Sequence, residues 1–121
     1  MQLDLPKPPS INHIYGYTCQ KGFARSYITK EGKNWFEVAS LMLKTQWHGV
    51  MVEKPCAVSI VLRTCRRQDV DNILKPILDL LQKTTVIKND ELIYELDIKK
   101  EKVSKEEEKV IVWVHDLDKT E

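Results

Sequence analysis

The sequence has few of the residues that stabilise small secreted domains or build metal centres. Its three cysteines, Cys19, Cys56 and Cys65, are widely spaced and form no Cys-x-x-Cys pair, and its three histidines are isolated from one another. Neither a disulfide framework nor a zinc site of cysteine and histidine is therefore expected. Signal-peptide features and apolar runs of about 18 residues are also missing. We expect free thiols, no membrane partner and a cytoplasmic location.

A strong net charge is missing as well, because the formal sum at pH 7 is only +1. This sum hides an asymmetry along the chain. Residues 1–68 carry 10 Lys and Arg against 4 Asp and Glu, a net of +6, whereas residues 69–121 carry 9 against 14, a net of −5. A polyanion can bind one face of such a protein, although the small total argues against indiscriminate coating of DNA.

The apolar pattern predicts a compact α/β (α+β) fold. Strands are predicted at residues 1–6, 56–64, 92–99 and 110–114. Amphipathic helices are predicted from Thr29, as the N-cap, to Gly49, and over the segment DNILKPILDLLQK. We therefore predict a single domain over residues 1–121, with a small mixed β-sheet and helices packed on one face.

Two polar segments are predicted to lie outside these elements. Residues 16–34 hold three of the four glycines and many polar side chains, which predicts a long mobile loop. Residues 99–109, KKEKVSKEEEK, are almost entirely charged, which predicts a solvated hairpin tip between the last two strands.

The most informative stretch is Arg66–Leu81, RRQDVDNILKPILDLL, which follows a predicted strand. Asp69 and Asp71 are one residue apart, and residues i and i+2 of an extended segment point to the same side. Two converging carboxylates repel each other, and a divalent cation with oxygen ligands, such as Mg²⁺, relieves that repulsion. The simpler alternative is that Asp71 or Asn72 caps the helix that follows.

Two further residues extend this acidic pair. If the strand at 92–99 lies beside the preceding strand, Asp90 at its start is expected to come near Asp69 and Asp71 and to complete a set of three carboxylates. Lys75 follows Asp71 by four residues, so both lie on one face of the predicted helix. Its ammonium group can stabilise a phosphate or a developing negative charge.

Basic residues around this stretch are candidates for phosphate contacts. Arg66 and Arg67 directly precede the acids and suit such contacts, although an ordinary solvated pair fits the same sequence. The lysines of residues 99–102 can extend that surface. Asp79, on the polar flank of the helix, is interpreted as a surface residue.

The ordered set of motifs resembles the RusA family of Holliday-junction resolvases. The matching segments are PPSIN (8–12), TKEGKNW (29–35), RRQDVDNILK (66–75), Leu-Asp (78–79) and VIKNDELIYEL (86–96). The resemblance spans nearly the whole chain, and its specificity comes from the order of the motifs because each of them is weak alone.

The resemblance implies roles for individual residues. The catalytic, metal-binding positions are matched by the acids Asp69, Asp71 and Asp90. The family's essential lysine is matched by Lys75. Positions that contact DNA are matched by Arg66, Arg67 and Asn72. It also implies a homodimer, Mg²⁺ or Mn²⁺ as the cofactor, no small-molecule cofactor, and an origin in bacteria, often on a phage or prophage. The substrate would be a four-way DNA junction, cut by paired symmetric nicks in recombination and repair.

Two positions depart from the family pattern. Gln68 stands where the family often has arginine before the first aspartate, so a phosphate contact is in doubt. Asn89-Asp90 replaces a frequent Asp-Asp pair, but the retained acid is the one at the catalytic position.

Other readings of the sequence remain open. The acids can serve a magnesium-dependent nuclease that acts on a different branched DNA, or they can be caps and ion-pair partners in a non-catalytic DNA-binding module. For the dimer, the first helix and the last strand offer aromatic residues, although core packing explains the same residues: Trp35, Phe36, Trp47 and Trp113.

Overall fold

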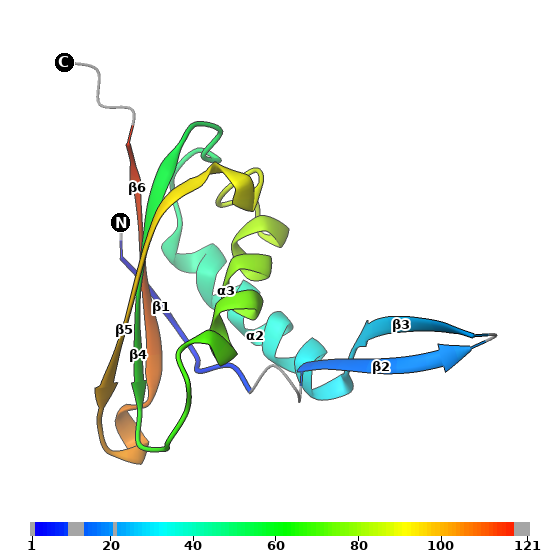
Figure 1. Ribbon diagram of the computed structural model, residues 1–121. Coiled ribbons are helices and arrows are strands. Elements are labelled where there is room, and N and C mark those ends of the chain that lie inside the picture. The colour runs from blue at the N-terminus through cyan, green and yellow to red at the C-terminus, as the bar shows by residue number, and fades with distance from the viewer. Residues whose placement is uncertain (1, 10–13, 21, 118–121) are drawn as a thin grey trace.

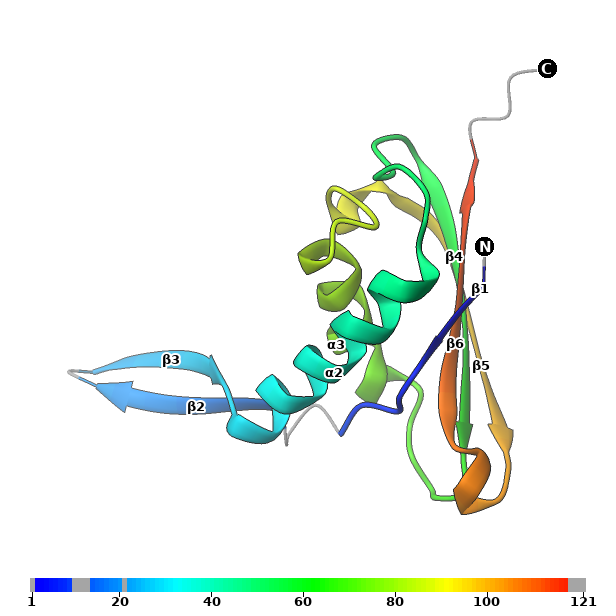
Figure 2. The ribbon, with the colours of Figure 1, turned by 180° about the vertical axis from the view of Figure 1, so that it is seen from behind.

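The computed structural model describes residues 2–9, 14–20 and 22–117, and it contains a four-stranded mixed sheet with two helices on one face (Figures 1 and 2). The strands lie in the order β1 (Gln2–Leu5), β6 (Lys109–Asp116), β4 (Cys56–Thr64) and β5 (Ile93–Lys102). β4 is antiparallel to β6 and parallel to β5, and β6 is antiparallel to β1. The predicted mixed sheet, with helices on one face, is confirmed.

Both predicted helices are present, as α2 (Lys30–Gln46) and α3 (Asp71–Lys83). Thr29 caps α2 as predicted, because its side chain accepts a hydrogen bond of 3.0 Å from the amide of Gly32. α2 ends at Gln46, three residues before the predicted Gly49. Neither helix of the described chain combines the length and apolarity needed to cross a membrane.

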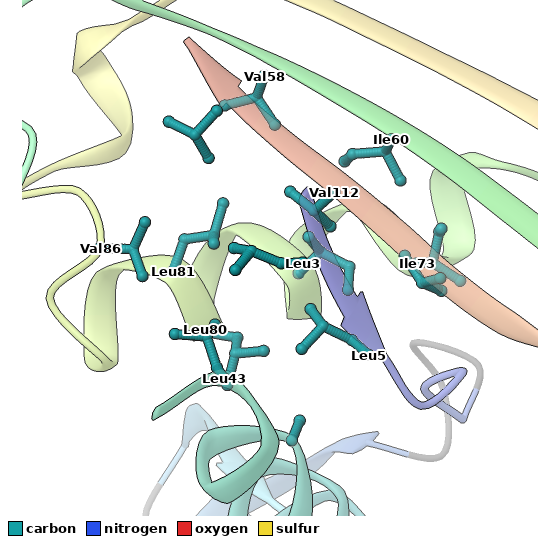
Figure 3. Close-up of a cluster of buried hydrophobic side chains, with 14 of the residues drawn as sticks. Leu3, Leu5, Leu43, Val58, Ile60, Ile73, Leu80, Leu81, Val86 and Val112 are labelled. Atoms are coloured by element: carbon teal, nitrogen blue, oxygen red, sulfur yellow. The ribbon is translucent and has the colours of Figure 1, made fainter. Parts of the chain in front are cut away.

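The core lies between the sheet and the helices. Alternate residues of β4, from Cys56 to Thr64, are buried on the helix-covered side, as expected for a strand with one face on the core. Leucines of β1 and α2 meet those of α3 in this layer (Figure 3). The buried strand and the buried faces of both helices hold the end of β4 in a fixed place, and the candidate site begins there.

The segment predicted as a loop over residues 16–34 is a hairpin followed by the start of α2. β2 (Tyr15–Gln20) pairs antiparallel with β3 (Phe23–Ile28), and Gly22 at the turn has a φ of +80°. Gly16 lies opposite Tyr27, whose ring occupies the space that a Cβ at Gly16 would need. The glycines thus mark a tight turn and a cross-strand packing site. The hairpin projects from the body of the molecule (Figures 1 and 2).

The prediction of a hairpin tip at residues 99–109 was also wrong. β5 extends to Lys102, and β4 lies between β5 and β6, so the two last strands are not neighbours. The connection crosses the end of β4 through a short 3₁₀ turn, η2 (Lys105–Glu107). A run of charged residues therefore passes directly beside the residues that follow β4.

The aromatic residues considered for a dimer surface lie mainly in the core. Trp35 and Phe36 are only 6% and 8% exposed, and Trp35 donates a hydrogen bond of 3.0 Å to the carbonyl of Pro6. Trp47 packs partly against the core, and Trp113 is half-buried. Burial excludes the first two residues from an interface in the folded chain.

Candidate active site

The acidic pair lies where β4 ends and α3 begins. After Thr64 the chain bends away from the sheet, and Asp71 is the first residue of α3. The amide of Asn72 donates to the carbonyl of Asp69 over 3.1 Å, which closes the turn. Asp69 and Asp71 are both exposed, and no residue that the structure describes forms a hydrogen bond or ion pair with either carboxylate. Both are therefore available to a ligand.

The helix-cap alternative for this pair is wrong. The N-cap of α3 is Val70, and no side-chain capping hydrogen bond forms there. Asp71 sits one position inside the helix and Asn72 follows it, so neither occupies the capping position. An acidic residue in the first turn still interacts favourably with the helix dipole, but that interaction leaves the carboxylate oxygens free.

Lys75 projects from α3 one turn after Asp71 and lies against an aromatic ring. Its Nζ atom is 4.3 Å from the centroid of the Tyr15 ring, within the range of a cation–π interaction. The hydroxyl of Tyr15 donates a hydrogen bond of 2.5 Å to Oδ2 of Asp79. Burial, and then the hydrogen bond to Asp79, raise the pKa of Tyr15, which keeps the phenol protonated as a donor.

This contact corrects the interpretation of Asp79 as a surface residue. Asp79 is half-buried and fixes the root of the β2–β3 hairpin to α3. The spacing of Asp71, Lys75 and Asp79 by four residues could have indicated a shared helix face. The part played by Tyr15 could not be read from the sequence, because it depends on where the hairpin packs.

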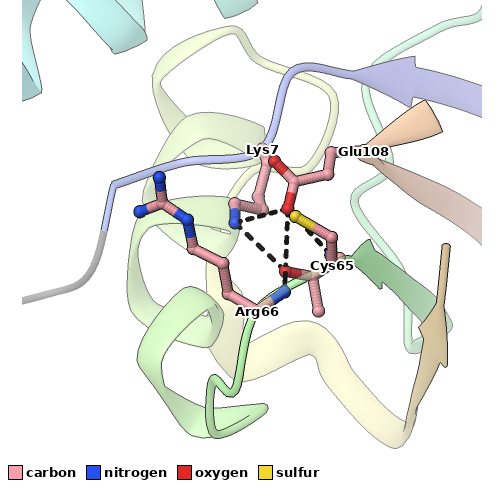
Figure 4. A network of polar contacts seen from close by, with 5 residues as sticks. Lys7, Cys65, Arg66 and Glu108 are labelled. Carbon is pink, nitrogen blue, oxygen red and sulfur yellow. Dashed lines mark hydrogen bonds and ion pairs between the residues drawn. The ribbon is translucent and has the colours of Figure 1, made fainter. Parts of the chain in front are cut away.

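A second polar network fixes the residues between β4 and the acids (Figure 4). Oε2 of Glu108 accepts hydrogen bonds from the amide of Cys65 at 2.8 Å, the hydroxyl of Thr64 at 3.1 Å and Nζ of Lys7 at 3.2 Å. The Thr64 hydroxyl in turn accepts from the amide of Arg66 at 3.1 Å. These donors, the Cys65 amide first, lower the pKa of Glu108 to about 2. The carboxylate is thus an anchor for the loop.

Cations surround the end of β4. Arg66 and Arg67 are exposed and line two shallow hollows. One hollow is completed by Lys100 and Lys102, and the other by residues that include Lys7. Nζ of Lys100 also donates to the carbonyl of Gln68 over 3.0 Å.

The remaining predicted contacts divide between these hollows and the far face of the sheet. Asn72 is half-buried and lines the hollow that includes Lys7. The registers of β5 with β4 place Lys99 beside Val61, on the face away from the helices, so this lysine does not join the basic group around Arg66.

Asp90 lies apart from the other acids, contrary to the expected placement. The strand at 92–99 does lie beside 56–64, but the two are parallel, with Ile93 beside Cys56 and Lys102 beside Thr64. Asp90, in the turn η1 (Asp90–Leu92), is therefore at the start of β4, and the acidic pair is at its end. Parallel strands align start with start, so an acid before one strand cannot meet acids after its neighbour.

The hydrogen bond of Asp90 shows the same separation. Its amide donates over 3.1 Å to Oε1 of Gln82, at the far end of α3 from Asp71. That stretch of helix is roughly 16 Å long at 1.5 Å per residue. The described residues include no group of three His, Cys, Asp or Glu side chains placed to hold a metal ion. One chain thus presents a pair of carboxylates and a distant third.

The sequence as a whole matches a known protein family. The sequence model described as "Endodeoxyribonuclease RusA" matches residues 6–115. The chain belongs to the RusA family. The resemblance inferred from the motifs is thereby confirmed, and the match includes both the acidic pair and Asp90.

One relative carries the name of the family. The crossover junction endodeoxyribonuclease RusA of Aquifex aeolicus (strain VF5) is 38% identical over 83 residues, which cover 67% of this chain and 65% of that protein. The similar region thus spans slightly less than two thirds of the relative. The matched range also includes Lys7, Tyr15 and Glu108, whose contacts hold the site and which no sequence motif indicated.

Proposed function

We propose that this protein is a magnesium-dependent endodeoxyribonuclease, active as a homodimer, that resolves four-way DNA junctions by paired symmetric nicks in recombination and repair. Membership of the RusA family and the name of the Aquifex relative support the class of reaction. The observation that carries the proposal is the exposed pair Asp69 and Asp71, with Lys75 on the next turn of α3 and Arg66 and Arg67 just before it.

The donor chemistry of the acidic pair suits magnesium. Mg²⁺ prefers oxygen ligands and is often held by one or two carboxylates, with waters and substrate phosphates filling its other positions. Asp69 and Asp71 would hold the ion, with Mn²⁺ as an alternative, and Asp90 is the third predicted ligand. When bound, the ion would supply positive charge and an acidified water to the scissile phosphodiester.

The chain's own cations would bind and orient the DNA. Arg66 and Arg67 would contact phosphates, because each of them lines both hollows. Lys75 would stabilise the negative charge that develops as the 3′ oxygen leaves. The ring of Tyr15 would hold the lysine in place, and Glu108 would keep the arginine loop anchored to the sheet.

Cleavage of a synthetic four-way junction tests this proposal. Wild type should nick the junction symmetrically with Mg²⁺ and leave linear duplex intact. Asp71→Asn should bind the junction but cut it on the order of 10²-fold more slowly, since it lacks one ligand. Asp116→Asn, an exposed acid at the far end of β6, should behave as wild type.

Other outcomes would redirect the assignment. If flaps or replication forks were cut in preference to four-way junctions, the acids would serve a nuclease of different substrate. If wild type bound DNA but cut nothing with Mg²⁺ or Mn²⁺, the protein would be a binding module and the nuclease proposal would be wrong.

A further inference from the structure

A cationic hollow lies where β4 and β5 end side by side, next to the acidic loop (Figure 1). Its volume is about 290 Å³. We call it the lysine hollow, and the residues that line it are Thr64, Cys65, Arg66, Arg67, Lys100 and Lys102. Four of these residues are basic and none is acidic, so the lining carries a formal charge of +4.

The register of the sheet selects which lysines of β5 enter this hollow. Lys100 and Lys102 lie beside Leu62 and Thr64, two residues of β4 that are buried under the helices. Because side chains alternate along a strand, both lysines point to the helix-covered side, where the acidic loop begins. Lys99 points to the opposite side. Only two of the three lysines therefore face the loop.

The charge of the lysine hollow is not neutralised within the described part of the chain. None of its four basic side chains takes part in an ion pair there, whereas Arg63, on the far face of the sheet, is paired with Glu101 at 3.0 Å. Positive charges held close together repel one another, and a bound anion removes that repulsion. Guanidinium and ammonium groups together suit a phosphate.

The second hollow beside the acidic loop suits an anion less well. Arg66 and Arg67 line it too, but its lining includes the acid Glu31. Its lysine, Lys7, already donates to Oε2 of Glu108 over 3.2 Å. A phosphate would thus meet one repelling carboxylate and fewer free donors there, which makes the lysine hollow the better phosphate site.

The lysine hollow also lies within one step of the acidic pair. Arg67 precedes Asp69 by two residues, so their Cα atoms are at most about 7 Å apart. Nζ of Lys100 donates to the carbonyl of Gln68 over 3.0 Å, directly before Asp69. An ammonium group has three N–H donors, so two remain for a phosphate oxygen. A phosphate in the hollow would therefore belong to the same stretch of DNA as a phosphate at the acidic pair.

We propose that the lysine hollow binds a second backbone phosphate of the DNA, beside the phosphate that is cut, and that Lys100 and Lys102 bind it from β5. Lys102 would contact the phosphate alone. Lys100 would also be a positioning residue, because it holds the carbonyl of Gln68 and with it the backbone that carries Asp69. The role in cleavage depends on the proposed nuclease function, whereas the phosphate site does not.

Binding of a four-way junction in EDTA tests the phosphate site without cleavage. Lys100→Gln/Lys102→Gln should weaken binding about tenfold and reduce the slope of log K against log salt by about 1, since one phosphate contact is lost. The matched control, Lys99→Gln/Lys109→Gln, removes the same charge from the face away from the helices and should keep the wild-type slope. Lys100→Arg/Lys102→Arg keeps the charge and should bind as wild type does. If the two glutamine variants had equal slopes, the phosphate site would be wrong.

Acetylation of lysines, read by mass spectrometry, locates the contact directly. The bound junction should slow the acetylation of Lys100 and Lys102 severalfold and leave Lys99 as reactive as in the free protein. Inorganic phosphate at the same ionic strength should protect none of the three. Protection by inorganic phosphate alone would show a site for a free anion rather than for DNA, and equal reactivity of all three lysines in the complex would also overturn the proposal.

Single variants separate the two roles in steady-state cleavage. Lys102→Gln should raise KM and leave kcat unchanged, because Lys102 contacts only a phosphate that is not cut. Lys100→Gln should raise KM similarly and also lower kcat about threefold to tenfold, because the backbone before Asp69 is held less firmly. Lys100→Arg should restore kcat. If kcat were the same for both glutamine variants, Lys100 would not be a positioning residue.

The two proposals fail differently. If wild type bound the junction with the expected difference in slope but cut nothing, the nuclease proposal would fall and the phosphate site would stand. If wild type cut junctions and the lysine variants bound them as wild type does, the phosphate site alone would fall.

Discussion

The two ends of the parallel β4–β5 pair differ in what they offer to a phosphate. At the end of β4, cations gather around the acidic pair, and the loop is held by the Glu108 network and by Lys100. At the start of β5, Asp90 stands between Asn89 and Glu91, and Lys88 is itself within 3.7 Å of Glu53. One end thus presents exposed arginines beside two carboxylates, whereas at the other end Lys88 lies near Glu53.

The end of β4 carries two exposed carboxylates beside exposed arginines, whereas Asp90 lies near the start of the same strand. Variants that alter the residues around the acidic pair, each matched with a control elsewhere in the chain, therefore test the comparison directly.

The largest difference in nicking rate is expected between variants of two lysines that lie toward opposite ends of α3. Nζ of Lys75 lies 4.3 Å from the ring of Tyr15, and Nζ of Lys83 lies 4.3 Å from the ring of Phe36. Lys75→Met should reduce the nicking rate on the order of 10²-fold, because it removes a cation beside the acidic pair. Lys83→Met loses an equivalent ring contact and should change the rate less than about twofold. If both variants lost the same fraction of the nicking rate in single-turnover assays, the contacts of the two lysines with the rings would matter only for stability.

Loss of the Glu108 anchor is expected to have the next largest effect, on stability. Glu108→Ala leaves the Cys65 amide and Lys7 without their shared acceptor and should lower the free energy of unfolding by about 2 kcal/mol at pH 7. The control Glu53→Ala removes an exposed ion pair at the other end and should cost less than about 0.5 kcal/mol.

The pH dependence separates this anchor from ordinary packing. The pKa of Glu108 is lowered from 4.5 to about 2 in the folded chain. Its contribution is therefore fully present above pH 4.5 and is lost as the pH falls through about 2. The difference between wild type and Glu108→Ala should narrow across that window in urea unfolding curves. A difference that did not change with pH would contradict the role of the charge.

The elements that depend on local pattern could be predicted from the sequence. The alternation in β4 and the apolar spacing in α3 located both elements within a residue, and with them the acidic loop. The neighbour of β5 was predicted correctly, but Asp90 was placed at the wrong end of β4, because the strand pattern alone does not give the direction of pairing. The sequence does not distinguish Glu108 from the glutamates and lysines around it, because its role depends on the crossover of the chain past β4.

A smaller effect is expected for DNA binding at the basic end. Arg67→Ala should weaken junction binding about threefold to tenfold and reduce the slope of log K against log salt by about 1, since one phosphate contact is lost. Arg63→Ala is the control, because Arg63 is already paired with Glu101 at 3.0 Å. Its salt slope should stay at the wild-type value. If both variants changed the salt slope equally, the proposed contact of the DNA phosphates with Arg67 rather than Arg63 would be wrong.

The smallest effect on nicking is expected for Tyr15, whose ring contacts Lys75 and whose hydroxyl donates to Asp79. Tyr15→Phe keeps the ring under Lys75 and removes the donor to Asp79, so stability should fall by about 1 kcal/mol and nicking by no more than about threefold. Because the pKa of Tyr15 is raised, its hydroxyl remains a donor throughout the working pH range, and the loss should not vary between pH 6 and 9. Tyr15→Leu also removes the ring and should slow nicking further. If the two variants slowed nicking equally, the hydrogen bond rather than the ring would be what positions Lys75.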